Sequence, residues 1–184
     1  EAMYHWDFFA RPPRTVPNTA VAAPVVSADG LTWTFKLKPQ IHFTDDPAFG
    51  GKPRELVAAD YVYSIKRYLD PNLRGGGDPL VSDLIVGMRN VVEAARKPGA
   101  KFDYNASVEG LRALDRYTLQ VQIVSPNYPT MTDAMVGMRA VAREVIEKYG
   151  ESDGRALANP VGTGPYRLAK WVRSSKILLE ANPH

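Results

Sequence analysis

The sequence predicts an α+β fold in which helices flank a mixed or antiparallel sheet. Three observations lead to this class. Residues 31–38 and 116–124 alternate apolar with polar side chains, which is the period of a half-buried strand. Residues 58–68 instead repeat apolar side chains at helical spacing. Fifteen prolines and fourteen glycines among 184 residues require many turns, and a hydrophobic fraction of 45% is enough for one globular domain with a buried core.

The first part of the chain contains the clearest strand. Residues 11–24 hold four prolines and are expected to run extended over a surface, as a connection and not as core. Residues 31–38 then place their apolar side chains on one face: Leu31, Trp33, Phe35 and Leu37. Ile41 and Phe43 are expected to extend the same sheet beyond Pro39.

Helical patterns occupy the middle of the chain. Residues 58–68 form the most regular one, and Pro71 ends it because proline disfavours helical geometry in the residue before it. Residues 74–79 include three consecutive glycines and predict a flexible loop. Residues 80–95 are expected to be helical in part, with a break around Gly87.

The last third returns to strands after two short helices. Residues 116–124 predict a second strand, and residues 130–138 and 143–149 predict helices, the latter capped by Gly150. Residues 166–172 and 176–181 are apolar runs that a three-residue turn joins, so they predict a β-hairpin.

Composition excludes several function classes. The absence of cysteine rules out disulfides, thiolate zinc sites and cysteine nucleophiles. The net charge of +3 comes from 23 basic and 20 acidic residues without a basic block, which argues against nucleic-acid binding. The longest apolar runs, such as residues 177–179, are far shorter than a membrane span, and residues 1–7 do not form a signal peptide. If the protein is exported, we expect its leader to lie outside this chain.

Three polar groupings could support chemistry. His42, Asp45 and Asp46 could ligate a metal, although loop aspartates after a strand are more simply explained by turn formation. A pair of carboxylates could act as acid and base, but no spacing singles out a pair among the candidates Asp7, Asp60 and Glu109. The only histidines besides His42 are His5 and the terminal His184. We therefore expect no metal and no enzymatic activity.

Two further motifs have structural interpretations. Gly162, Thr163 and Gly164 resemble a phosphate-binding loop, but Pro165 follows where such a loop requires lysine. We interpret them as a tight crossing that only glycine permits. An aromatic cluster near the start of the chain could stack on a ligand, but burial statistics favour a place in the core: Trp6, Phe8 and Phe9.

Four segments together resemble the family 5 solute-binding proteins of ABC importers, whose best-known members bind oligopeptides and dipeptides. They are residues 27–38, 58–67, 113–123 and 160–166, the last with the sequence PVGTGPY. One position departs from the family. The family commonly has threonine before the helix at residue 58, where Val57 cannot cap the free amides, so another group must supply that hydrogen bond or the stabilisation is lost.

The resemblance implies that residues 1–184 are a single partial domain, from the first lobe of a two-lobe fold of the type II periplasmic binding protein kind. The implied function is the capture of peptides or similar small solutes outside the membrane and their delivery to an ABC permease. The implied protein is periplasmic, monomeric at full length, and without a cofactor. Pro79 and Leu80 stand where oligopeptide binders have a proline and an aromatic contact residue, and they are the candidate ligand contacts. The alternative is a self-contained structural or partner-docking module without a transport ligand.

Overall fold

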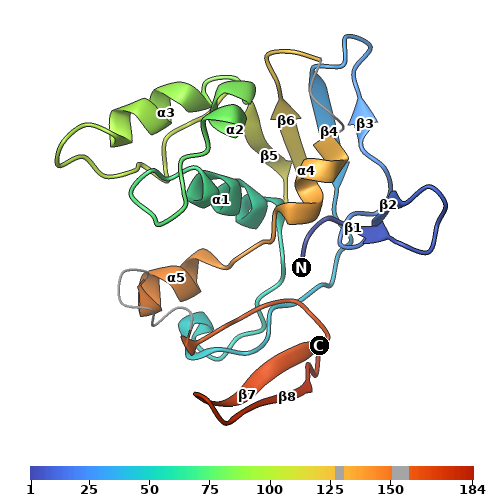
Figure 1. Ribbon diagram of the computed structural model, residues 1–184, viewed down its shortest axis with the longest axis vertical. Helices are drawn as coiled ribbons and strands as arrows, with labels where there is room; N and C mark the ends of the chain where they lie inside the picture. Colours follow the sequence, from blue (N-terminus) through green and yellow to red (C-terminus); the bar gives the residue numbers. More distant parts are fainter. Residues whose placement is uncertain (127–130, 151–157) are drawn as a thin grey trace. The chain divides into compact units, whose positions relative to one another are not determined.

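The computed structural model describes residues 1–126, 131–150 and 158–184, and the chain folds into two compact units. Unit 1 comprises Glu1 and residues 39–56 and 140–184, and unit 2 comprises residues 2–38 and 57–139. Figure 1 shows the elements of both, which we describe separately. Within the described residues, no helix is long and apolar enough to cross a membrane.

Unit 2 is built on a four-stranded antiparallel sheet with the order β3-β4-β6-β5 (Figure 1). Its central strands pair Phe35 with Leu119 and Trp33 with Val121. The strands span Val25–Val26 (β3), Thr32–Lys36 (β4), Leu111–Asp115 (β5) and Thr118–Gln122 (β6). The two alternating segments are thus confirmed as strands, and β5 is an additional strand that their pattern did not predict.

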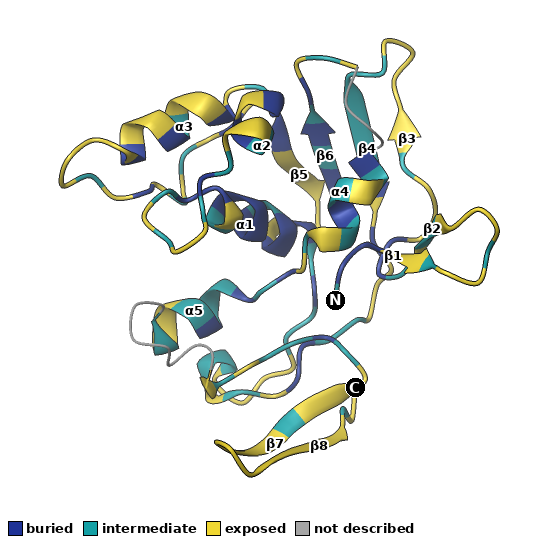
Figure 2. Cartoon of the chain, viewed as in Figure 1, coloured by how far each residue is buried: buried dark blue, intermediate teal, exposed yellow. Residues whose placement is uncertain are grey.

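Helix α1 (Ala58–Tyr68) packs on β5 and β6 and covers the core of unit 2. Tyr61 and Ile65 on the helix, and Phe35 and Leu119 on the sheet, are each at most 1% exposed. Figure 2 shows this buried surface along α1 and β6. Deep burial of such large apolar side chains is the main stabilising term of a domain of this size.

The start of α1 is capped by groups other than Val57. The carboxylate of Asp60 accepts a hydrogen bond from the Val57 amide at 2.8 Å, and the carbonyl of Arg116 accepts one from the Ala58 amide at 2.9 Å. Helix N-termini leave such amides without intrahelical partners. The missing threonine cap is therefore replaced by a buried acid and by the turn between β5 and β6.

Two short helices follow α1 in unit 2. They are α2 (Pro79–Leu84) and α3 (Met88–Ala95), and Gly87 between them has a φ of +80°. A side chain is strained in this left-handed region, so the predicted break at this glycine is confirmed. Helix α4 (Met131–Gly137) contacts β1, and its predicted first residue, Thr130, lies outside the described residues.

The first residues of unit 2 form a hairpin that the sequence did not predict. Strand β1 (Tyr4–Asp7) pairs with β2 (Arg14–Pro17), which lies within the segment expected to be a surface connection. Thr19 and Ala20 of that segment are at most 1% exposed, so its interpretation as a connection was wrong. The prolines are accommodated because three of them lie in the turn or at the strand end: Pro12, Pro13 and Pro17.

Unit 1 contains a single-turn helix, an α-helix and a separate hairpin. These are η1 (Pro47–Phe49), α5 (Arg143–Tyr149), and β7 (Tyr166–Val172) paired with β8 (Lys176–Ala181). The predicted helix at residues 143–149 and the predicted hairpin are both confirmed. The few deeply buried apolar side chains of unit 1 include Phe43, Leu56 and Val145.

Ile41 and Phe43 do not extend the sheet of β4, so that prediction was wrong. Gln40 has a φ of +63°, which turns the chain after Pro39. The segment beyond it pairs with residues 54–56 instead: the Phe43 amide donates to the carbonyl of Arg54 at 2.8 Å, and the Leu56 amide donates to that of Ile41 at 2.7 Å. The alternation of apolar residues in the sequence continues past Pro39, but the turn at Gln40 takes these residues away from the sheet.

Candidate functional site

The predicted ligand contacts lie at the start of α2. Pro79 is the first helical residue, and the carboxylate of Asp78 caps the helix by accepting a hydrogen bond from the Leu80 amide at 2.9 Å. The hydroxyl of Tyr68 donates to the other oxygen of Asp78 at 3.2 Å. Leu80 is 78% exposed. The helix start thus holds a large apolar side chain in solvent, where it can pack against a ligand.

The glycine-rich loop before α2, predicted to be flexible, makes several contacts with the rest of unit 2. A Cβ atom on Gly76 would lie 2.1 Å from the carbonyl oxygen of Asp70, which no real side chain tolerates. The amide of Gly77 donates to the carbonyl of Tyr68 at 3.2 Å, and the guanidinium of Arg96 donates to the carbonyl of Gly77 at 3.2 Å. These contacts fix the loop that positions Leu80.

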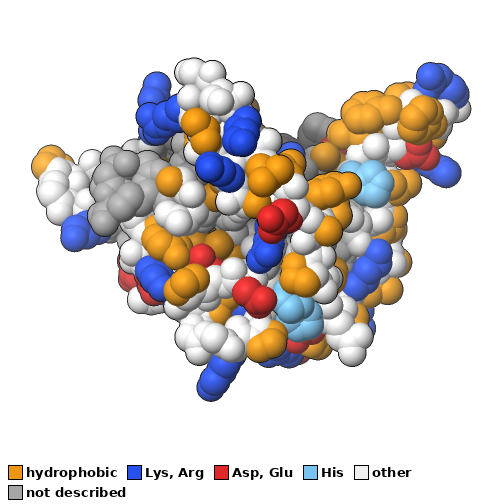
Figure 3. Space-filling model, turned by 90° about the horizontal axis from the view of Figure 1, so that it is seen from below, with side chains coloured by type: hydrophobic (Ala, Val, Ile, Leu, Met, Phe, Trp, Pro, Cys, Tyr) orange, Lys and Arg blue, Asp and Glu red, His pale blue; other side chains and the backbone are white. Residues whose placement is uncertain are grey.

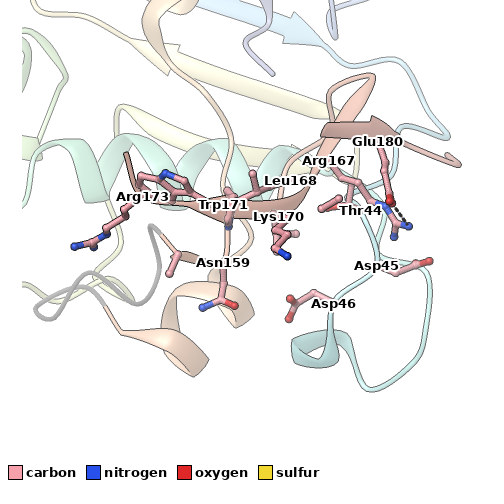
Figure 4. Close-up of a pocket in the computed structure, with 14 residues that line it drawn as sticks. Thr44, Asp45, Asp46, Asn159, Arg167, Leu168, Lys170, Trp171, Arg173 and Glu180 are labelled. Carbon is pink, nitrogen blue, oxygen red and sulfur yellow. Dashed lines mark hydrogen bonds and ion pairs between the residues drawn. The ribbon is translucent and has the colours of Figure 1, made fainter. Parts of the chain in front are cut away.

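Unit 1 contains a cavity of about 630 Å³ along one side of the β7–β8 hairpin (Figure 4). Arg167, Lys170 and Trp171 of β7 face Asp46 and Asn159 across it. Arg167 forms an ion pair with Glu180 at 3.1 Å. The lining carries both signs of charge and is more polar than apolar, so the cavity suits water or a charged solute better than an apolar ligand. The sequence did not predict it, because its lining comes from residues 44–46 and from residues beyond 157, which are far apart in the sequence.

The side chains considered for a metal site have other partners. Asp46 accepts hydrogen bonds from the Ala48 amide at 2.7 Å and from the Tyr149 hydroxyl at 3.0 Å. Asp45 pairs with His184 at 3.0 Å, and the ring of His184 lies 5.9 Å from that of His42. Among the residues that the structure describes, no three His, Cys, Asp or Glu side chains are grouped so that they could hold a metal ion.

The carboxylates considered for catalysis occupy three different settings. Asp7 accepts hydrogen bonds from the amides of Phe9 and Ala10, which forms the turn after β1. Asp60 caps α1 and is 3% exposed. Glu109 is an exposed loop residue. Asp7 and Asp60 thus stabilise the backbone next to them, one in a turn and one at a helix start.

The interpretation of residues 162–164 as a crossing that only glycine permits was wrong. Gly162 and Gly164 do not have positive φ values, and a Cβ atom on either would meet no described atom closer than 3.9 Å. The segment is held by hydrogen bonds instead: the carbonyl of Gly162 accepts from the Thr44 amide at 2.8 Å, and Thr163 Oγ1 accepts from the N-terminal amine of Glu1 at 2.8 Å.

The aromatic cluster near the start of the chain is not in the core. Trp6, Phe8 and Phe9 are 36%, 67% and 96% exposed, so that expectation was wrong. The reason is the hairpin: β1 ends at Asp7, and the two phenylalanines lie in the turn that follows, beyond the reach of the sheet. Figure 3 shows apolar side chains gathered beside arginine or lysine at upper right.

Comparison with known proteins gives matches over most of the chain. A family profile described as bacterial extracellular solute-binding proteins, family 5 Middle, matches residues 14–184. The periplasmic oligopeptide-binding protein OppA of Salmonella typhimurium is 31% identical over 172 residues, which cover 91% of this chain and 28% of that protein. The di/tripeptide-binding protein 2 of Pseudomonas aeruginosa is 26% identical over 182 residues, and the match covers 30% of that protein.

Solved structures show a similar fold. Listeria monocytogenes OppA bound to peptide superimposes with a TM-score of 0.73 at 22% identity, and the match covers all of this chain and 33% of that one. Burkholderia pseudomallei OppA gives a TM-score of 0.70 at 24% identity. The fold of this chain is therefore that of part of a periplasmic binding protein, and the chain spans about a third of the length of the proteins it matches.

Proposed function

The chain belongs to the bacterial extracellular solute-binding proteins of family 5, and we propose from this that the protein it forms captures peptides or similar small solutes for an ABC permease. The observation that carries the proposal is the 31% identity to an oligopeptide-binding protein across 91% of the chain. The proposed location is the periplasm, and the proposed partners are the solute and the membrane permease. The relatives are binding proteins, and we propose that this protein also leaves its ligand chemically unchanged.

The proposed mechanism is closure of two lobes around the solute. A ligand that contacts both lobes stabilises the closed form by its higher affinity for that form, and the closed form then docks on the permease. Within this chain, the start of α2 is the proposed ligand contact because Leu80 is exposed while its backbone is fixed by Asp78. An apolar contact held in this way costs little conformational entropy on binding.

The β7–β8 hairpin supports a larger protein over a self-contained module. Six of its large apolar side chains are between 37% and 66% exposed: Tyr166, Trp171, Val172, Ile177, Leu178 and Leu179. An isolated two-stranded hairpin is marginally stable in water. Such a surface is expected to be covered by further protein in a molecule of the length of the relatives.

Thermal unfolding in the presence of peptides tests the function. A protein that contains this chain at the length of its relatives is scanned against dipeptides and oligopeptides, with the 184-residue chain as the control. A ligand that binds only the folded protein adds about 2.7 kcal/mol of stability at a hundredfold excess over its dissociation constant. A raised midpoint in the long protein alone supports the proposal, and equal shifts in both contradict a cleft shared between lobes.

The ligand contact is tested separately. Leu80→Ser in the long protein is expected to weaken peptide binding several-fold, as measured by calorimetry. The matched control is Leu114→Ser, because Leu114 is also exposed, at 50%, but lies on β5. Equal affinities for the two variants would remove Leu80 from the site while leaving the transport function untouched.

A further inference from the structure

The turn between β1 and β2 presents aromatic side chains to solvent. Phe9 is almost fully exposed, Phe8 is two-thirds exposed, and the ring of Trp6 lies 6.4 Å from that of Phe8. We call Trp6, Phe8 and Phe9 together with Arg11 and Arg14 the aromatic tip. Large exposed apolar groups that gather at one place mark an interaction surface more often than scattered ones do.

The aromatic tip has a defined backbone conformation. The carboxylate of Asp7 accepts hydrogen bonds from the amides of Phe9 at 3.1 Å and Ala10 at 3.2 Å. The guanidinium of Arg11 donates to the carbonyls of Phe8 at 2.5 Å and Ala10 at 3.0 Å. These four bonds hold the turn in which both phenylalanine side chains are exposed. The exposure is a built feature of the turn, not the consequence of a loose loop.

The charge around the aromatic tip is mainly positive. Arg11 is exposed, the Arg14 side chain is 73% exposed, and Asp7 is the one acidic residue between residues 4 and 17. Because Asp7 also lies 3.9 Å from the Arg14 guanidinium, its charge is partly offset. Aromatic rings combined with arginine are typical of protein segments that lie at the membrane–water interface.

We propose that the aromatic tip inserts into the headgroup region of an anionic phospholipid bilayer. The two phenylalanines and Trp6 would enter the boundary between headgroups and acyl chains, while Arg11 and Arg14 attract anionic phosphates. A small convex turn fits this partner, because a lipid surface needs no matching cavity, whereas a stable protein interface buries about 800 Å² on each side. This inference is independent of the peptide ligand.

Co-sedimentation with vesicles tests the proposal. A protein that contains this chain at the length of its relatives is mixed with vesicles of phosphatidylcholine alone or of phosphatidylcholine with roughly 30% phosphatidylglycerol, which makes a strongly anionic membrane. The double variant Phe8→Ser/Phe9→Ser is expected to lower partitioning onto the anionic vesicles by about tenfold or more, from the apolar area it removes. Arg11→Gln/Arg14→Gln is expected to lower it by a similar factor on anionic vesicles and to have little effect on neutral ones.

Matched controls separate the aromatic tip from general stickiness. Val25→Ser removes an exposed apolar side chain, 70% exposed, from β3 of the same unit, and Arg74→Gln removes an exposed charge from a loop. Both are expected to change partitioning by less than about twofold, and circular dichroism checks that every variant is folded. Failure of the unmodified protein to sediment with anionic vesicles overturns the proposal. Equal binding by the Phe8→Ser/Phe9→Ser variant also overturns it, since the contact would then lie elsewhere, for example on the β7–β8 hairpin.

Discussion

The sheet of unit 2 and the hairpin of unit 1 are both antiparallel, yet they bury very different amounts of their surface. In unit 2, β6 has three of its five residues buried, under α1. In unit 1, no residue of β7 or β8 is buried, and Leu168 alone is half-buried. Backbone pairing is present in both. The difference shows that strand pairing defines local structure, whereas a covering layer is needed for a core.

The largest expected difference between the two regions concerns loss of an apolar side chain. Phe35→Ala in β4 removes a side chain that is fully buried, and it is expected to lower the free energy of unfolding by about 3–5 kcal/mol. Ile177→Ala in β8, where the side chain is 64% exposed, is expected to change it by less than about 0.5 kcal/mol. Urea unfolding measures both, and comparable losses would contradict the comparison.

The second expected effect is a loss of stability at alkaline pH in unit 2. Burial raises the pKa of Tyr4 to about 12, and its hydroxyl donates to the carbonyl of Ala22 at 2.8 Å. In the unfolded chain the Tyr4 hydroxyl ionises near pH 10. The stability that Tyr4 contributes is therefore present below that pH and is lost as the pH rises toward 12. The loss attributable to Tyr4 is expected to be about 2 kcal/mol.

Tyr4→Phe serves as the comparison for this titration. The variant is expected to be less stable than the unmodified chain at about pH 8, because it lacks the hydrogen bond. It is also expected to lose less stability between pH 10 and 12. Unfolding midpoints across this range measure the difference. Parallel curves for the two proteins would show that Tyr4 ionises normally.

The third expected effect concerns the start of α1. Asp60→Ala removes the carboxylate that accepts the Val57 amide, and it is expected to cost about 1–2 kcal/mol. Glu109→Ala, at an exposed acidic position of the same unit, is the control and is expected to change stability by less than about 0.5 kcal/mol. If urea midpoints of the two variants coincide, the Asp60 cap does not stabilise the helix.

The smallest expected effect is in unit 1. Partial burial is the largest single influence on the pKa of Glu144 and raises it, but the hydrogen bond from Arg54 at 2.8 Å, a backbone hydrogen bond and the charges of Arg54 and Arg143 together lower it overall. The ion pair therefore contributes stability above pH 4.5 that is lost as the pH falls below it. Because the Glu144 side chain is 42% exposed, the contribution is expected to be below about 1 kcal/mol.

Glu144→Gln checks this contribution. Its stability is expected to fall less than that of the unmodified chain between about pH 5 and about pH 3, which bracket the ordinary carboxyl range. Glu147→Gln provides the matched comparison, because it removes the ion pair of Arg143 with Glu147, whose side chain is more exposed than that of Glu144. An identical acid response in the Glu144 variant would show that this ion pair adds no stability.

The sequence predicted the elements whose residues show a clear period of apolar side chains or a glycine break. The bounds of α1 and of both hairpin strands in unit 1 agree with the apolar runs, and the positive φ of Gly87 explains the predicted break. Strand β5 was missed because it is an edge strand in which Leu111 alone is buried, so little alternation is visible. Its position depends on pairing with β6, which no local pattern encodes.

The candidate site was less predictable because exposure depends on tertiary context. The sequence Asp-Pro at residues 78–79 is a recognisable helix start, since aspartate caps and proline fits the first turn. This signal could have placed the start of α2, but not the exposure of Leu80. The rings of the aromatic tip were expected in the core because large aromatic side chains are usually buried. Composition does not show that Asp7 and Arg11 form the hydrogen bonds of a turn in which these rings are exposed.

The three tryptophans of the chain are distributed one to each sheet. Trp6 lies in β1, Trp33 lies in β4 with its indole N–H donating to the carbonyl of Gly30 at 3.0 Å, and Trp171 lies in β7 with the Arg173 guanidinium 5.8 Å from its ring centre. Replacing two of them by phenylalanine leaves one indole, which red-edge excitation selects over the nine tyrosines. Three such single-tryptophan proteins would report by emission wavelength on the two hairpins and the central sheet separately, without an attached dye.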